Sequence, residues 1–109
     1  MKKFLVLYRS SASAMDQMAA TTPEQRKAEM EKWMAWGASA GAALADWGAP
    51  LGQSAVMRGS KGADQIGGYS ILQAASIDAA QKLLDAHPHF GAPAATIELI
   101  EIMPMPGGK

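Results

Sequence analysis

Two segments, one near each end of the chain, carry apolar residues on both faces that a β-strand would present, since successive side chains of a strand point to opposite sides. Residues 3–8 (KFLVLY) place Phe4, Val6 and Tyr8 on one side and two leucines on the other. Residues 95–103 (ATIELIEIM) also carry apolar residues on both alternating sides. Such a pattern is typical of a strand that is buried on both faces. We therefore predict two strands that are covered on both sides.

Two further strands are predicted in the middle of the chain. Residues 43–52 (ALADWGAPLG) form a short strand that ends in a turn containing Pro and Gly, and residues 53–58 (QSAVMR) are expected to extend it after a bulge. Residues 65–75 (QIGGYSILQAA) predict the other strand. Its Gly67–Gly68 pair indicates a bulge or a close backbone contact.

A helix is predicted between the first two strands. Thr22 followed by Pro23 is an N-terminal helix signature, and the helix is expected to end at Ala40 or Gly41. Its core-facing residues, taken at helical spacing, are Met30, Trp33, Met34, Gly37 and Gly41. A glycine inside a helix costs about 1 kcal/mol relative to alanine. We therefore expect these glycines to permit close approach of the helix to the sheet.

A second, shorter helix is predicted before the last strand. Ser76 is a suitable N-cap, and Asp78 in the first turn complements the helix dipole. We expect the helix to run to residue 87, because the proline at position 88 pushes the residue before it out of helical geometry. Its core-facing residues are Ala79, Ala80, Leu83 and Leu84.

The predicted order of elements is strand, helix, strand, strand, helix, strand. This is the α+β, ferredoxin-like βαββαβ arrangement, a four-stranded antiparallel sheet with both helices on one face. The other face would be bare and apolar, and a large exposed apolar surface marks an interaction site. We therefore predict a homodimer whose sheets pack face to face. Residues 1–103 are assigned to a single domain and residues 104–109 to a C-terminal tail.

Composition narrows the class of protein. The chain has 109 residues, ten basic and ten acidic side chains and no cysteine. The balanced charge argues against nucleic acid as a partner and gives no reason to expect a membrane. Without cysteine there is no disulfide, thiolate nucleophile or Cys-ligated zinc. No segment has the length of a signal peptide core or a membrane span, so a soluble cytoplasmic protein is expected.

Four motifs carry a family resemblance over residues 3–103: "FLVLY", "WGAPLG", "QIGGYSIL" and "SIDAAQKLLDAHPHF". On these motifs the chain resembles the YCII-related family of the dimeric α/β-barrel superfamily. The resemblance implies a dimeric α/β barrel with a pocket beside the sheet, in a family whose members mostly have no assigned reaction. Some relatives pair a histidine of the first helix with a later aspartate, but this first helix has no histidine and His87 stands at the aspartate's place. The Asp-Gly-Pro-Phe motif of another branch is also absent.

Both histidines of the chain, His87 and His89, flank a proline after the second helix. In an extended segment they would point to the same side and could transfer protons near neutral pH. One of them could instead line a ligand pocket, or the pair could bind a metal with Asp85 as the evident third ligand. The structural alternative is that His87 caps the negative end of the helix as a cation and His89 fills a turn. We expect no metal.

Five further residues are candidate ligand contacts. Tyr8 could bind or donate a proton and Arg9 could hold a carboxylate, or they are a core tyrosine and an edge arginine. Asp46 could act as an acid whose pKa is raised by burial, or it is an exposed turn residue. Arg58 and Tyr69 would lie near each other only if their strands pair. They could then form a pocket wall, or they are ordinary surface residues of the sheet.

Three functions fit these residues. The first is a small-molecule-binding protein that is also a cofactor-independent lyase or isomerase, with His87 or His89 moving a proton and an arginine holding an anionic group. The second is a binding or accessory protein without chemistry. The third, by superfamily analogy, is a monooxygenase. No glycine-rich nucleotide motif is present, so no cofactor is expected.

Overall fold

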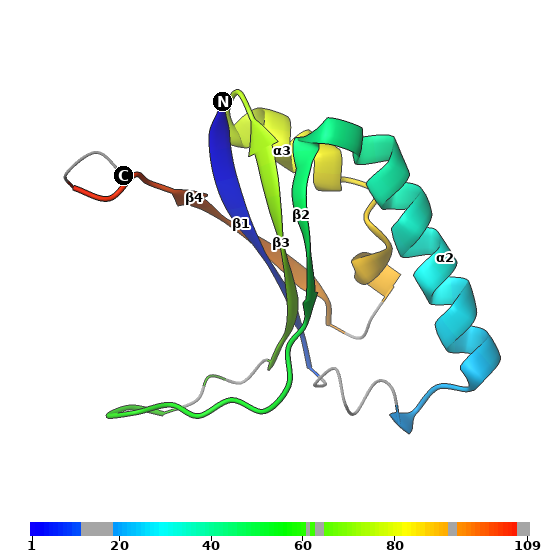
Figure 1. Cartoon of the computed structure of the whole chain (residues 1–109). Coiled ribbons are helices and arrows are strands. Elements are labelled where there is room, and N and C mark those ends of the chain that lie inside the picture. The colour runs from blue at the N-terminus through cyan, green and yellow to red at the C-terminus, as the bar shows by residue number, and fades with distance from the viewer. Residues whose placement is uncertain (12–18, 61, 63–64, 92–93, 107–109) are drawn as a thin grey trace.

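The computed structural model describes residues 1–11, 19–60, 62, 65–91 and 94–106, and within them four strands form one antiparallel sheet in the order β2-β3-β1-β4 (Figure 1). The strands are β1 (Lys2–Ser10), β2 (Leu44–Pro50), β3 (Gln65–Ala74) and β4 (Thr96–Ile102). Helix α2 (Pro23–Ala40) connects β1 to β2, and α3 (Ile77–Leu84) connects β3 to β4. Both helices lie on the same side of the sheet (Figure 1). The predicted α+β, ferredoxin-like fold is confirmed.

Helix α2 begins as the sequence predicts. The Thr22 hydroxyl accepts a hydrogen bond from the Gln25 backbone at 3.1 Å, and the Gln25 side chain accepts one from the Thr22 backbone at 2.9 Å. This reciprocal capping box satisfies two amide groups that the first turn leaves unpaired. Pro23 then occupies the first helical position, where its missing N–H removes no helical hydrogen bond.

The predicted core face of α2 is wrong in part. Met30 and Met34 are 61% and 57% exposed, whereas the residues that pack toward the core are Trp33, Trp36, Gly37 and Ala40. Alanine, methionine and tryptophan occur all round this helix, so hydrophobic spacing alone does not select one face. Gly41 lies at the C-cap with φ +57° rather than in the core.

Gly37 supports the predicted close approach between helix and sheet. A Cβ atom added at this position would lie 2.0 Å from Cη2 of Trp47 on β2. The Trp47 indole therefore occupies the space that any side chain at Gly37 would need.

The central pair of strands contains the predicted bulge. Tyr8 pairs with Gly68, but the next residue of β1, Arg9, pairs with Ile66, so Gly67 is the extra residue on β3. The expectation that residues 53–58 extend β2 is wrong, because β2 ends at Pro50 and this segment has no strand partner in the described structure. The last ladder-like bond joins the Leu51 N–H to the Gly67 carbonyl at 3.0 Å.

Helix α3 begins where expected and ends earlier. The Ser76 hydroxyl accepts a hydrogen bond from the Ala79 backbone at 3.2 Å. The helix ends at Leu84 rather than at residue 87, and Pro88 opens a short 3₁₀ turn, η2 (Pro88–Gly91). The His87 N–H bonds to the Leu84 carbonyl at 3.1 Å, so a tight turn has replaced the helical path before the proline is reached.

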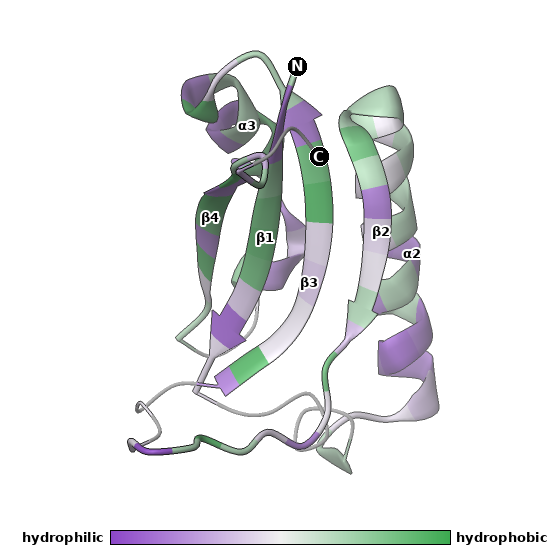
Figure 2. Cartoon of the chain, turned by 60° about the vertical axis from the view of Figure 1, so that its left-hand side comes forward, coloured by the Kyte–Doolittle hydropathy of each residue, from purple (hydrophilic) through white to green (hydrophobic). Residues whose placement is uncertain are grey.

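The two faces of the sheet differ in their cover. The helix-covered face contributes Phe4, Val6, Tyr8 and Leu72 to the core. The open face carries half-buried or exposed residues that are register neighbours, namely Leu5, Leu7, Tyr69, Ile71 and Ile100. Figure 2 shows this face, with hydrophobic residues through the middle of β1 and alternating with hydrophilic ones along β4. No helix in the described part of the chain is long and apolar enough to cross a bilayer.

Candidate functional site

The two histidines lie between η2, helix α2 and strand β1, and both are buried. The side chain of His87 is 2% exposed and that of His89 is 8% exposed. The His87 ring packs against three aromatic rings, with centroids 4.9 Å from Tyr8, 4.4 Å from Trp33 and 4.3 Å from Trp36. The indole of Trp33 meets it edge to face, at 87°. His87 therefore occupies an aromatic cage built from β1 and α2.

The hydrogen bonding of His87 defines its tautomer. Its Nδ1 accepts a hydrogen bond from the backbone N–H of His89 at 2.9 Å, so the proton of the neutral ring is on Nε2. Nε2 is buried and has no hydrogen-bond partner within the described residues. Burial, with a smaller contribution from nearby His89, lowers the pKa of His87 from 6.5 to about 4. At neutral pH His87 is thus an uncharged ring with one unused donor.

His89 has a different role. Its Nε2 lies 2.8 Å from the carbonyl oxygen of Arg9 and 3.1 Å from that of Thr96. Both are acceptors, so Nε2 carries a proton and donates to them. His89 therefore connects η2 to the end of β1 and the start of β4, where Arg9 pairs with Thr96. Its Nε2 atom is fully occupied by these two backbone carbonyls.

Two sequence expectations about these histidines are wrong. The segment is a 3₁₀ turn and not an extended strand, and His87 accepts from the backbone of His89 instead of standing beside it. His87 also does not cap α3 as a cation, because burial keeps it neutral and its ring faces the aromatic cage. The described residues contain no group of three His, Asp or Glu side chains that could hold a metal ion.

Tyr8 joins the histidines at the site. Its ring centroid is 5.3 Å from that of His89, and its hydroxyl donates to the Ser70 hydroxyl at 2.9 Å. Ser70 donates in turn to the carbonyl of Trp47, also at 2.9 Å. Burial raises the pKa of Tyr8 to about 12, and the hydrogen bond with Ser70 offsets part of that rise. A buried chain of hydrogen bonds therefore crosses from β1 through β3 to β2.

The guanidinium of Arg9 lies on the other side of the sheet. Its Nε and Nη2 atoms contact the Glu98 carboxylate at 3.0 and 2.9 Å, a diagonal ion pair between the paired strands β1 and β4 on the open face, where Arg9 pairs with Thr96 and Glu98 with Leu7. The backbone carbonyl of Arg9 lies on the histidine side and accepts a hydrogen bond from His89. The carboxylate that Arg9 holds in this structure belongs to the chain itself, and the predicted contact between Arg9 and a ligand stays a prediction.

The other three predicted contacts lie away from the histidines. Asp46 is exposed, and its Oδ1 accepts a hydrogen bond from the Gly48 N–H at 2.8 Å, which stabilises a turn within β2. Arg58 lies in the exposed segment after β2 with φ +57°. Tyr69 is half-buried in β3 and pairs with Leu7 and not with Arg58. The structure does not bring Arg58 and Tyr69 together.

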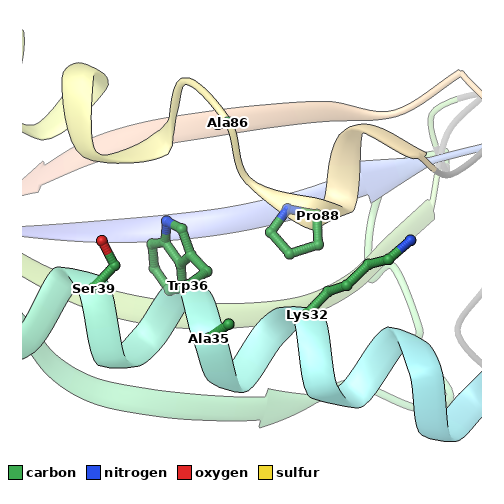
Figure 3. A pocket seen from close by; sticks show the side chains of 6 residues that line it. All are labelled: Lys32, Ala35, Trp36, Ser39, Ala86 and Pro88. Atoms are coloured by element: carbon green, nitrogen blue, oxygen red, sulfur yellow. The ribbon is translucent and has the colours of Figure 1, made fainter.

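A groove opens between α2 and the segment that leads from α3 into η2. Its volume is about 430 Å³, and its lining consists of Lys32, Ala35, Trp36, Ser39, Ala86 and Pro88. Figure 3 shows Lys32 and Trp36 rising from α2 toward the segment that carries Ala86 and Pro88. The Trp36 indole N–H donates to the Leu83 carbonyl at 2.8 Å, which fixes the ring at this place.

The groove and the buried histidine share a wall. Trp36 both lines the groove and contacts the His87 ring, and the neighbours of His87 in the chain, Ala86 and Pro88, also line it. Sequence reasoning missed Lys32, Trp36 and Ser39 as a group. Their spacing places them on one face of α2, but no local signal indicates that the turn after α3 lies opposite.

Comparison with known families gives one match. The model of the YCII-related domain matches residues 1–106 of this chain. No curated protein matches it. The matched region contains both the sheet and the site around His87, and the description of the family names no activity.

Proposed function

Because the chain belongs to the YCII-related domain family, we propose, from its site geometry, that it binds a small molecule in the groove beside α2. His87 supplies a neutral hydrogen-bond donor to that molecule from behind Trp36. The observation that carries this proposal is the buried Nε2–H of His87, which has no partner within the described residues.

An unpaired buried donor is unusual. Folded proteins pair the large majority of their buried polar atoms, and leaving one unpaired costs about 1–3 kcal/mol. This cost would be removed if a ligand oxygen accepted a hydrogen bond from the Nε2–H of His87. Because strained or unsatisfied groups collect at functional sites, this atom supports a binding role for the surrounding pocket.

The groove is the site we propose for this ligand because Trp36 belongs both to its lining and to the aromatic cage of His87. A rotation of the Trp36 ring away from His87 would open a path from the groove to the imidazole, since Trp36 both contacts His87 and lines the groove. Such a rotation breaks the hydrogen bond from Trp36 to Leu83. Ligand binding and movement of Trp36 would therefore be coupled.

The geometry favours a binding role over proton transfer by the histidine pair. Nδ1 of His87 is held by a backbone N–H, and Nε2 of His89 is held by two carbonyls. If chemistry follows binding, a fixed neutral imidazole of this kind would donate a hydrogen bond to a substrate carbonyl and polarise it. A neutral histidine has this role in triosephosphate isomerase. The lyase or isomerase assignment stays a prediction.

We further propose that the protein acts as a homodimer through the open face of its sheet. Support comes from the apolar register neighbours Leu5, Ile71 and Ile100, which no helix of the described chain covers. Exposed apolar surfaces of this kind are typical of protein–protein contacts. The groove lies on the helix side, so a dimer formed in this way leaves it open to solvent.

The binding proposal is tested by NMR on ¹⁵N-histidine-labelled protein. Small aromatic carboxylates, amides and alcohols are titrated while the ring nitrogens of His87 are observed. We expect at least one probe to move the Nε2 resonance of His87 and to lose about fivefold or more in affinity in His87→Phe, which keeps a ring and removes the donor. Lys27→Gln, an exposed change on α2 outside the groove, serves as control. If no probe moves the His87 ring in the wild-type protein, the proposal is wrong, whether or not His87→Phe folds.

A further inference from the structure

We infer that the ligand of the groove is a small carboxylate with a flat apolar body. Lys32 holds its carboxylate, and the Trp36 ring packs on its apolar body. This inference rests on the proposed function, since it names the class of molecule that the same groove takes. It follows from which polar groups the lining offers and from the shape of the apolar surface between them.

The polar side chains of the lining, apart from the Trp36 indole, are those of Lys32 and Ser39. The Lys32 ammonium only donates hydrogen bonds, and the Ser39 hydroxyl can donate or accept one. Lys32 is the charged residue of the lining, and it makes no ion pair within the described residues. His87 does not line the groove, and its buried Nε2–H becomes a further donor only when the Trp36 ring that packs on it moves, as proposed above. The Trp36 N–H is already engaged with the Leu83 carbonyl. Donors of this kind match a ligand group rich in acceptor oxygens.

Acidic side chains of the same elements lie outside the groove. Asp85 precedes Ala86 in the chain, and Glu29 lies one helical turn before Lys32, but both are exposed and neither lines it. The local charge inside the lining is therefore positive. A carboxylate satisfies Lys32, whereas a cationic ligand would place like charges together.

The apolar part of the lining includes two rings. The indole of Trp36 rises from α2 and the ring of Pro88 lies on the opposite segment (Figure 3), and Ala35 and Ala86 also belong to the lining. Planar rings stack on aromatic and proline faces more completely than branched chains do. The groove has a volume of about 430 Å³ and is open to solvent, since Lys32, Ala35, Ser39 and Ala86 of its lining are exposed. A volume of this size is within the range of small-molecule sites.

The test compares benzoate with two probes that each lack one of its features. Benzamide keeps the ring and the shape but not the charge, and acetate keeps the charge but not the ring. Binding is followed by the indole N–H resonance of Trp36 and quantified by titration. Lys32→Gln removes the cation, and Lys27→Gln removes an exposed lysine of the same helix that does not line the groove.

We expect benzoate to bind more tightly than benzamide and acetate. Lys32→Gln should weaken benzoate by about threefold or more, which is the effect of losing one partly exposed charge pair, while benzamide binding stays unchanged. Lys27→Gln should leave both unchanged. Equal binding of benzoate and benzamide, or benzoate binding that ignores Lys32→Gln, overturns the assignment of a carboxylate and leaves the groove as a binding site. If none of the probes moves the Trp36 resonance, the inference and the proposed function both fail.

Discussion

At the scale of single residues, the unusual feature is a histidine that the fold keeps neutral. His87 is surrounded by Tyr8, Trp33 and Trp36 and receives a hydrogen bond on Nδ1 from the next histidine's backbone. A charged imidazole in this cage would lose its hydration without gaining a carboxylate. The pKa of His87 is therefore lowered, which ties the stability of the fold to pH.

We predict that acid destabilises the protein through His87. The pKa of His87 is about 4 in the folded chain and about 6.5 in the unfolded chain, so between these values only the unfolded chain binds the proton. The stability that the neutral His87 contributes to the folded chain is fully present above pH 6.5 and is lost as the pH falls toward 4. It amounts to roughly 2 kcal/mol or more of unfolding free energy. Urea unfolding at pH 7, 5.5 and 4.5 measures it, and an identical pH slope in His87→Phe would contradict this account.

A second prediction at this scale concerns the chain of hydrogen bonds from Tyr8 through Ser70 to the Trp47 carbonyl. Ser70→Ala leaves the Tyr8 hydroxyl and the Trp47 carbonyl without the hydrogen bonds that Ser70 makes to them. We expect it to cost roughly 1–3 kcal/mol of unfolding free energy. Tyr8→Phe removes one donor and leaves Ser70 bonded to Trp47, so it should cost only about 1 kcal/mol. In a double-mutant cycle by urea denaturation, the double variant should cost less than the sum. Additive costs would show that the two hydroxyls are not coupled.

At the scale of elements, helix α2 is placed on the sheet by the absence of a side chain. Gly37 leaves the room that the Trp47 ring of β2 fills, and Trp36 bonds to the end of α3 at 2.8 Å. These two contacts position α2 against elements on both of its flanks. The groove between α2 and η2 has its width set by this placement.

The contact between Gly37 and Trp47 predicts that the effect of Gly37→Ala on stability changes sign when Trp47 is removed. In the wild-type chain, Gly37→Ala should destabilise the protein although alanine is the better helix former by about 1 kcal/mol, because the new methyl group meets the indole. In a Trp47→Ala background the same substitution should stabilise it by up to about 1 kcal/mol. Thermal unfolding of the four proteins measures the cycle. The same sign in both backgrounds would argue against a contact between helix and ring.

The sequence predicted the elements because their signals are local. Thr22 with Pro23 marks the start of α2, Ser76 marks the start of α3, and the glycine pair of β3 marks the bulge opposite Tyr8. All three depend on hydrogen bonds or backbone freedom within a few residues. The fold class followed from their order.

The parts that sequence could not supply depend on contacts between distant segments. Which face of α2 is buried depends on Trp47 and on the turn after α3, so Met30 and Met34 were misplaced. The state of His87 depends on an aromatic cage that comes from β1 and α2, more than 50 residues away in the chain. Of the predicted site residues, Tyr8 and the two histidines come together, because the bulge and η2 bring them to one end of β1.

At the scale of the whole molecule, the sheet separates two surfaces with different proposed tasks. The helix side holds the aromatic cage and the groove, and the open side holds the Arg9–Glu98 ion pair among apolar residues. A partner bound to the open side would bury the half-exposed residues of β1 and β4. It would not obstruct the groove.

We predict that the wild-type chain is a dimer and that Ile100→Lys converts it to a monomer. Ile100 is 41% exposed on the open face and pairs in register with Leu5, so a lysine there would place a charge in the proposed interface. Light scattering coupled to size-exclusion chromatography at micromolar concentration measures the mass. Met34→Lys, an equally large change at an exposed position on α2, should keep the dimer. A monomeric wild-type protein would refute the proposed assembly.

The aromatic cage also gives the protein an optical signal of its own. The chain has three tryptophans. Trp33 and Trp36 lie within ring-contact distance of His87, and Trp47 packs on Gly37. A protonated imidazole accepts an electron from an excited indole more readily than a neutral one, so emission should dim when His87 gains its charge. A molecule that enters beside Trp36 and displaces its ring should alter the same emission. We therefore expect the fluorescence of the unlabelled chain to change when His87 is protonated and when the proposed ligand binds.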